Sequence, residues 1–404
     1  MALVKKRRLR TGTSVWVDYP HRLPLVSRIK RSFKTDILVV GAGISGSLVA
    51  CTLAASGNKV AIIDRRGPAL GSTPASTALL QFEIDTPLLH LKRKIGAAPA
   101  ERAWVRSKES LDCLRTLIRK TLGPAAISVR NSVYMAGNVL PAREMIREAR
   151  ARQRIGLPSQ YLTRTQLQRR FRLTRAGAIV SSDNLAADPI ELTTGFIGQA
   201  QHCGARLFSP HEIVDVQAAR RSVLAGTADG FEIQARKVVL CTGYELPKIV
   251  PVAGHRLAST WAIATRAQPK RLWPEQCFIW EASTPYLYAR TTFDGRVICG
   301  GEDEEFVDEN RRDAKLSEKT NRIQNKLQQL LPAIDARPVF RWTGTFGESA
   351  TGLPSIGEIP GYANCFAVLG FGGNGITFSM LAAQLISAAI RGRKDPDARL
   401  FAFR

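Results

Sequence analysis

One stretch near the start of the chain, GAGISG at residues 41–46, restricts the possible folds more than any other feature of the sequence. The apolar run DILVV at 36–40 precedes it, as a buried parallel strand requires. SLVACTLAASG at 47–57 then predicts a helix that ends at Gly57, and KVAIID at 59–64 predicts a second strand. This order of elements predicts a dinucleotide-binding βαβ unit.

The spacing of the glycines and of one acid explains how such a unit holds a nucleotide. Gly41 permits the tight turn, Gly43 lets the backbone approach a pyrophosphate, and Gly46 lets the helix pack closely on the strand. The free N–H groups and the positive dipole end of the helix then face the phosphates. Asp64 closes the second strand, 21 residues after Gly43 (64 minus 43), where its carboxylate can accept hydrogen bonds from ribose hydroxyls.

A second glycine-rich turn lies close to the end of the chain, in VLGFGGNGITF at 368–378. Gly370, Gly372 and Gly375 repeat the same spacing between an apolar run and a helix-like run. Only 29 residues follow Gly375 (404 minus 375), and they hold one predicted helix, a short tail and no second strand. This turn therefore does not begin a second nucleotide-binding fold.

Three features favour FAD over NAD as the nucleotide. VVLCTG at 238–243 is a late strand that ends in a small-residue turn, and STPASTALLQ at 72–81 is rich in small hydroxyl residues. The glycine-rich turn near the end of the chain is the third feature. Arg65 and Arg66, which follow the acid, are compatible with a 2′-phosphate, but a surface or adenine-side position is the favoured interpretation.

The rest of the chain predicts a mixture of helices and strands. Amphipathic periodicity predicts helices at 100–122, 141–154, 188–204 and 315–331. The helix at 188–204 carries Asp188 as its cap and Pro189 in its first turn. Residues 278–300 alternate as strands do, with a hairpin turn at Asp294-Gly295. Further strands are expected at ARLF, HEIVDV, GFEIQA, KVVLCTG and CFAVLG.

Composition excludes several classes of protein. The net charge is +24, from 58 basic and 34 acidic residues, but no nucleic-acid-binding signature accompanies it, so a nucleic-acid partner is not expected. The seven cysteines are scattered and never form C-x-x-C, which favours reduced thiols in a cytoplasmic protein. Histidine spacing predicts no metal site. The apolar runs at 37–58 and 365–390 contain glycine clusters and favour strand–turn–helix units over transmembrane segments.

Taken together, these motifs resemble the D-amino-acid-oxidase-like family of FAD-dependent oxidoreductases. The resemblance extends from residue 35 to residue 391 and is most specific in GAGISG…IID and GFGGNGITFSMLAA. GGED at 300–303 and TGLPSIG at 351–357 also match it. It implies an α/β fold: a Rossmann-like FAD-binding domain of the glutathione-reductase type, with a discontinuous α+β substrate domain built on an antiparallel sheet.

The resemblance also implies how the chain is divided. Residues 1–34 are expected to form a basic N-terminal arm, predicted to be a solvated tail. The FAD-binding domain would comprise 35–91, 184–247 and 338–404, and the substrate domain 92–183 and 248–337.

The same resemblance assigns the cofactor contacts. The last glycine-rich turn would begin a helix whose dipole stabilises negative charge on the flavin ring. No cysteine or histidine lies in 71–81, so FAD is expected to be non-covalent. The implied FAD-binding residues are Gly41, Gly43, Ile44, Ser45, Gly46, Asp64, Arg65, Ser72, Thr73, Thr77, Ala78, Leu79, Ile213, Thr242, Gly243, Gly372, Gly373, Asn374, Gly375 and Ile376.

The implied reaction is oxidation of the C–N bond of a small amine or amino acid by hydride transfer to flavin N5. The imine then hydrolyses, and O2 or another acceptor, such as a quinone, takes the electrons. No catalytic acid or base is assigned, because an amine that binds in its neutral form does not need a strong base. The expected substrate contacts are Trp280, Tyr286, Tyr288, Arg290 and Phe346.

One departure from the family's pattern concerns the substrate. Amino-acid-oxidising relatives often carry an arginine in a G-x-R-P turn that clamps the substrate carboxylate. Here the matching stretch is WTGTFGES at 342–349, with Phe346 in that position. An amine, or an acid held by Arg290 or Arg341, therefore fits better than a simple α-amino acid.

Three alternatives remain from the sequence. A 2-hydroxy-acid dehydrogenase could use the same fold and pass electrons to a quinone. A flavoprotein acting on modified tRNA would suit the positive charge. A flavin-binding protein without turnover is the third.

Overall fold

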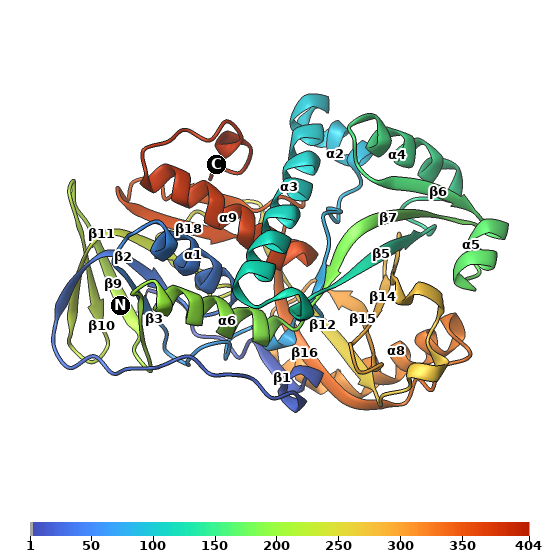
Figure 1. Cartoon of the computed structure of the whole chain (residues 1–404), viewed down its shortest axis with the longest axis horizontal. Coiled ribbons are helices and arrows are strands. Elements are labelled where there is room, and N and C mark those ends of the chain that lie inside the picture. The colour runs from blue at the N-terminus through green and yellow to red at the C-terminus, as the bar shows by residue number, and fades with distance from the viewer. Residues whose placement is uncertain (1–2, 404) are drawn as a thin grey trace.

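Two β-sheets organise the chain, and each is assembled from segments that are far apart in the sequence (Figure 1). The structure is a computed structural model that describes residues 3–403. The eight-stranded sheet and its helices lie on the left of Figure 1, and most of the ten-stranded sheet lies on the right. The architecture is the α/β arrangement that the sequence predicted, a Rossmann-like domain beside a domain built on an antiparallel sheet.

The smaller sheet has a parallel centre, in the order β17-β18-β11-β2-β3-β8. β17 joins it antiparallel, and β9 and β10 extend from β11 as antiparallel strands. Its strands are β2 (Phe33–Val40), β3 (Val60–Ile63), β8 (Arg206–Phe208), β9 (Ile213–Ala218), β10 (Val223–Thr227), β11 (Glu232–Leu240), β17 (Ser355–Glu358) and β18 (Cys365–Leu369). The prediction of separate strands at GFEIQA and KVVLCTG is wrong, because β11 runs through both and pairs with β2 along its length.

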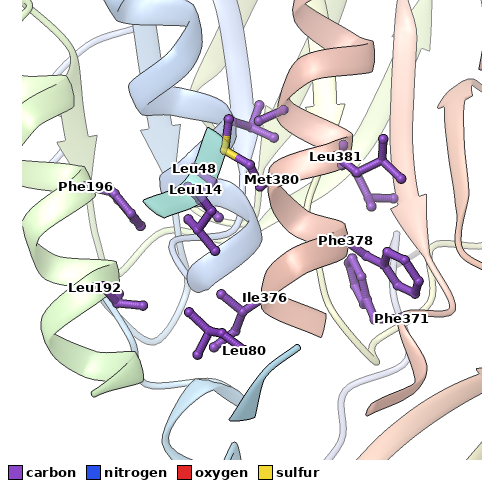
Figure 2. Packing of buried hydrophobic residues seen from close by; sticks show 14 of the residues in the cluster. Leu48, Leu80, Leu114, Leu192, Phe196, Phe371, Ile376, Phe378, Met380 and Leu381 are labelled. Atoms are coloured by element: carbon purple, nitrogen blue, oxygen red, sulfur yellow. The ribbon is translucent and has the colours of Figure 1, made fainter. Parts of the chain in front are cut away.

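Both faces of this sheet are buried, which explains its continuous apolar runs. Ile37 and Val39 point toward the helices, whereas Leu38 and Val40 point toward β9, β10 and the N-terminal segment. The covering helices are α1 (Ile44–Ala55), α3 (Ala97–Thr121), α6 (Pro189–His202) and α9 (Gly375–Ile390). Figure 2 shows where they meet: Leu48 and Leu114 lie between Phe196 of α6 and Met380 of α9.

Helix α9 lies at the centre of this packing. It contacts α1, α3 and β17. The stretch Gly372–Ile390 is the one helix among residues 3–403 that is long and apolar enough to span a membrane, but 67% of its apolar window is buried inside the protein. Its apolar side chains are therefore used as a core helix uses them.

The larger sheet is mostly antiparallel, in the order β1-β16-β12-β15-β14-β13-β5-β7-β4, with β6 added beside β7. The expected hairpin turn at Asp294-Gly295 joins β14 to β15, with φ of Gly295 at +84°. The strands are β1 (Arg10–Thr13), β4 (Leu79–Leu80), β5 (Ser128–Met135), β6 (Ser159–Thr163), β7 (Gly177–Ala186), β12 (His255–Thr265), β13 (Phe278–Glu281), β14 (Leu287–Thr291), β15 (Val297–Glu304) and β16 (Pro338–Ser349).

Helices cover one side of the larger sheet. Ile279 and Ala289 share a core cluster with Ile323 and Leu327 of α8, so alternate residues of β13 and β14 point away from that cluster. The remaining helices are α2 (Leu88–Ile95), α4 (Ala142–Arg154), α5 (Arg164–Phe171), α7 (Glu309–Ala314) and α8 (Leu316–Leu330). The four helices predicted from periodicity correspond to α3, α4, α6 and α8, and Asp188 caps α6 as expected.

The N-terminal segment is not a solvated arm, so that expectation is wrong. β1 pairs with β16, and Val15 and Trp16 are fully buried. The indole N–H of Trp16 donates to the carbonyl oxygen of Ser76 at 2.6 Å. The core contacts of the segment come from isolated apolar residues rather than from a periodic run. The many basic residues around them therefore made the segment resemble a solvated tail in the sequence.

The division into domains stays a prediction, but one of its boundaries does not follow the sheets. β16 lies within residues 338–404, which were assigned to the FAD-binding domain, yet it pairs with β12 and β1 of the larger sheet. The chain returns to the smaller sheet only at β17. β16 thus connects the two sheets.

Candidate active site

A single long cavity joins the two sheets and contains almost every residue expected to bind the cofactor. It begins at the turns that follow β2, β3 and β11 and ends against the larger sheet. Of the residues predicted to hold FAD, all line the cavity except Gly46. Residues from six separate chain segments therefore meet in one cavity.

The turn after β2 has the geometry that a pyrophosphate requires. The φ of Gly41 is +112°, and a Cβ there would lie 2.3 Å from the carbonyl oxygen of Cys241. Gly43 has no side chain to cap α1, and the N–H of Ile44 donates to Oγ1 of Thr73 at 3.2 Å, so the backbone N–H groups further along the first turn remain available. Gly46 acts behind the cavity: its Cβ would lie 1.9 Å from the carbonyl oxygen of Gly41, so only glycine lets α1 pack this closely.

Asp64 holds the turn while it faces the cavity. Its carboxylate accepts hydrogen bonds from the backbone N–H groups of Ala42 (2.7 Å), Arg66 (2.7 Å) and Gly67 (2.8 Å). A carboxylate offers about four lone-pair sites. One direction is therefore left for a ribose hydroxyl.

Arg65 and Arg66 are neutralised by acids of the protein. Both guanidinium groups pair with Glu245, which is only 4% exposed. Arg65 also lies 3.4 Å from Glu212. These pairs favour an adenine-side position for the two arginines, and they leave little free positive charge for a 2′-phosphate.

The second glycine-rich turn forms the other end of the cofactor cradle. Gly372 has a φ of +54°, and no side chain caps the first turn of α9 at Asn374. The amide nitrogen of Asn374 donates to the carbonyl oxygen of Glu83 at 2.8 Å, and its buried Oδ1 has no partner within the described chain. Free N–H groups and an unused buried acceptor fit a polar ring such as that of a flavin.

Aromatic side chains form the wall that the larger sheet contributes. Trp280, Tyr286, Tyr288 and Phe346 line the cavity, and their role as substrate contacts stays a prediction. Trp280 stacks on Tyr134 with ring centroids 3.8 Å apart, and its indole N–H donates to Ser132 at 2.8 Å. The cavity face of β13 and β14 is therefore rigid and largely apolar.

Arg290 does not contact the cavity, so its assignment to the substrate site is wrong. The residue is 3% exposed, and its Nη1 donates to the carbonyl oxygens of Ala78 (2.6 Å) and Ala187 (3.0 Å). Burial lowers the pKa of this guanidinium. Arg290 therefore fixes the loop that carries Thr77 and Ala78. Arg341 is exposed and does not line the cavity either.

Sequence reasoning missed several residues of this end of the cavity. Asp85, Tyr244 and Thr260 line it. Tyr244 follows VVLCTG directly and was detectable by position, whereas Asp85 carries no motif signal. Burial raises the pKa of the Asp85 carboxyl, and the hydrogen bond from the N–H of Gly373 (2.7 Å) opposes that rise.

Comparison with known proteins agrees with this geometry. The family described as FAD dependent oxidoreductase matches residues 36–389.

This chain belongs to that family.

Curated relatives are distant but extend over most of the chain. Glycine oxidase of Geobacillus kaustophilus is 24% identical over 89% of this chain and 93% of its own length. Gamma-glutamylputrescine oxidoreductase of Escherichia coli is 22% identical over 90% of this chain and 85% of its own. The crystal structure of glycine oxidase from Geobacillus kaustophilus matches the fold with a TM-score of 0.75, at 20% identity, over 92% of this chain and 98% of that one.

Family membership makes the protein an FAD-dependent oxidoreductase. The cavity described above fits that cofactor, with two helix N-termini, a carboxylate at the end of β3 and an aromatic wall. When bound, FAD would be held by the residues of the two glycine-rich turns and of the 72–79 segment.

Proposed function

We propose that this protein oxidises the C–N bond of a small amine or amino acid. The observation that carries the proposal is that one cavity connects the cofactor cradle to an aromatic compartment on the larger sheet. The names of the relatives, glycine oxidase and gamma-glutamylputrescine oxidoreductase, support a substrate with a C–N bond.

The chemistry balances with one two-electron acceptor. FAD, when bound, takes the hydride equivalent that leaves the substrate carbon and passes two electrons to O2 or a quinone-type acceptor. The substrate nitrogen loses a proton, so a C=N bond replaces the C–N bond. Water then adds to the imine, which gives a carbonyl compound and ammonia or a smaller amine.

The protein supplies position and electrostatics in this reaction. Trp280, Tyr286 and Phe346 enclose the substrate and exclude water. The uncapped N-terminus of α9 places its positive dipole end at the cavity, where it stabilises developing negative charge. We assign no side chain as general base, because an amine that enters in its neutral form reacts without one.

Two further points belong to the same proposal. FAD is held without a covalent bond, because the loop at 71–81 offers no cysteine or histidine. Precipitation with trichloroacetic acid should therefore leave the flavin in the supernatant, and a yellow pellet would contradict this expectation. We also propose a cytoplasmic location, from the free cysteines.

An anaerobic titration tests the function. Purified protein should show a flavin spectrum, and one amine or amino acid should bleach it. Bleaching only by hydroxy acids would replace this function with the dehydrogenase alternative. Failure to bind FAD at all, even after reconstitution, would overturn the assignment of the cavity.

A further inference from the structure

The far end of the cavity carries acidic groups that the proposed function does not use. Asp85 lines the cavity beside the last glycine-rich turn, where its side chain is accessible while the surrounding chain desolvates its carboxyl group. Its carboxylate oxygens lie 2.7 and 2.9 Å from the positions that a Cβ of Gly372 and of Gly373 would take. The absence of side chains in this turn therefore makes room for the carboxylate.

Two more carboxyl groups lie close to Asp85. Asp303 accepts a hydrogen bond from the hydroxyl of Tyr286, a residue of the cavity wall, and its Oδ1 is buried without a partner in residues 3–403. Glu348 lies on β16 and is exposed near the same end. Burial and the charges of Asp85 and Asp303 raise the pKa of Glu348 to about 7. The negative charge of Asp85 therefore disfavours ionisation of both Asp303 and Glu348.

The basic side chains near this group are engaged by other acids. Lys319 donates to the carbonyl oxygen of Glu302 and pairs with Glu304, each at 2.8 Å. Arg256 pairs with Glu305 at 3.0 Å. The only lysines or arginines that line the cavity, over the described part of the chain, are Arg65 and Arg66, and both are bound to Glu245 at the nucleotide end.

Electrostatics then restricts what can bind there. A carboxylate removed from water costs free energy unless a cation or hydrogen bonds offset the loss. A substrate carboxylate would add a like charge to Asp85 and would find no guanidinium to clamp it. A positive group would be attracted by the acids and by the faces of Trp280 and Tyr286.

The reacting nitrogen does not supply that positive charge. It must be uncharged when the carbon gives up hydride, because an ammonium nitrogen has no lone pair for the new C=N bond. A positive charge that pairs with the acids at the far end would therefore belong to a second group of the substrate, at a distance from the reacting carbon.

Resting on the proposed function, we propose that the substrate is an amine with a second, distal positive charge and no carboxylate, and that Asp85 binds this distal cation. Tyr286 and Trp280 would cover the chain between the two nitrogens. The class includes linear diamines and amines that carry a quaternary ammonium or guanidinium group.

A comparison of three ligands with the same chain length tests the proposal. Putrescine, butylamine and γ-aminobutyrate are added separately to the anaerobic FAD holoenzyme. We expect putrescine to bleach the flavin at a concentration at least about tenfold lower than butylamine, since one charge-assisted contact is worth that much or more. γ-Aminobutyrate should not bleach it.

Binding without turnover separates a cation site from a general loss of activity. Tetramethylammonium cannot be oxidised, and its binding to the holoenzyme is read from the flavin difference spectrum. Asp85→Asn should weaken its binding at least about tenfold, because the variant removes the carboxylate charge that attracts the cation. Glu348→Gln should weaken it less, because Asp85 lines the cavity and Glu348 does not. Asp112→Asn, on the surface of α3, is the matched control and should change nothing.

Several outcomes would overturn the proposal and leave the function in place. One is bleaching by γ-aminobutyrate at a lower concentration than by putrescine. Another is an Asp85→Asn variant that binds FAD more weakly but still prefers putrescine to butylamine by the same factor, since Asp85 would then be a cofactor contact. A different result would overturn the function instead. In that case no amine or amino acid would bleach the flavin, although tetramethylammonium would still bind and its binding would still depend on Asp85.

Discussion

At the scale of single residues, the shape of the cavity depends on glycines, which have no Cβ, as much as on the side chains that line it. Gly46 has no Cβ and therefore lets α1 touch the turn at Gly41, while Gly372 and Gly373 leave space for Asp85. The polar residues around them either brace the backbone, as Asp64 does, or carry charges that no basic side chain offsets, as Asp85 does.

Gly46→Ala tests the close packing of α1. Its new Cβ would lie 1.9 Å from the carbonyl oxygen of Gly41, so α1 must move away. We expect the free energy of unfolding to fall by about 1–3 kcal/mol. The dissociation constant for FAD, measured by fluorescence quenching, should rise at least about tenfold, which corresponds to 1.4 kcal/mol.

Gly198→Ala is the control for that variant. Gly198 lies inside α6, and nothing lies within 4 Å of the position of a Cβ there. Alanine should stabilise the helix by about 0.5–1 kcal/mol and leave FAD affinity unchanged. Equal losses in both variants would show that helix packing at Gly46 is not special.

Glu348→Gln tests the repulsion among the acids. The folded-state pKa of Glu348 is about 7, above the ordinary 4.5, so the folded state favours the protonated form and loses stability as the pH rises between those values. Asp85, Asp303 and Glu305 repel its charge, and Arg256 opposes them. Above pH 7 the variant should melt about 1–3 °C higher than wild type. This shift corresponds to a gain of up to about 1 kcal/mol in the free energy of unfolding. Below about pH 4 the two should melt together, since glutamate is then protonated in both states.

Glu318→Gln gives the comparison for that experiment. Glu318 is an exposed acid on α8 that pairs with Arg322 at 2.6 Å. Removing an attractive surface pair should not raise the melting temperature at any pH. A gain as large as that of Glu348→Gln would point to a general effect of the protein's net charge.

At the scale of elements, helix ends and strand alternation place the functional groups. Helices α1 and α9 both direct their N-termini at the cavity, because each follows a glycine-rich turn after a parallel strand. On the larger sheet, alternate residues serve opposite purposes: Ile279 and Ala289 enter the core, whereas Trp280 and Tyr288 face the cavity. Buried ion pairs then hold the helices that cover this sheet.

Glu148→Ala tests a buried ion pair within α4 whose acid also binds the start of α2. Glu148 accepts from the backbone N–H groups of Leu88 (2.7 Å) and Leu89 (2.9 Å), and from Arg152 at 2.8 Å. Both charged residues are fully buried. Alanine would leave the Arg152 charge unpaired, so we expect a loss of about 3–5 kcal/mol in denaturant unfolding. Arg147→Ala, exposed on the same helix, should stay within about 0.5 kcal/mol of wild type.

At the scale of the whole molecule, the active site exists only where the two sheets meet. β16 belongs to the larger sheet and leads the chain back to the smaller one, and β1 adds the N-terminal segment to its edge. That segment continues to Trp16, which contacts both the 72–79 loop and, at 5.3 Å, the guanidinium of Arg290.

Trp16→Ala tests whether the N-terminal segment supports the cofactor site. Trp16 is 1% exposed and donates to Ser76. We expect a loss of about 3–5 kcal/mol in the free energy of unfolding, as for other buried aromatic residues. FAD should also bind more weakly, because Ser76 lies in the cavity wall. Leu25→Ala, at a residue 81% exposed, should change neither quantity.

Local patterns made much of this predictable. The glycine spacing, the acid at the end of β3 and the cap of α6 are each read within a few residues, because the backbone conformation they require is local. The aromatic wall followed from strand alternation. Arg290 was misassigned because strand alternation predicts which face of the sheet a side chain lies on, but not which segment packs against that face. The loop at Thr77 and Ala78 covers the sheet at this position.

The sequence by itself determined the FAD-binding unit, its two glycine-rich turns and the class of fold, because these depend on short-range steric and hydrogen-bonding needs. Only the tertiary structure decided that Asp85 lies beside Gly373, that Arg290 supports a loop, and that residues 3–29 contribute to the core. These facts depend on contacts between segments hundreds of residues apart, where burial and electrostatic partners are fixed by the packing of whole sheets. Local spacing carries no information about that packing.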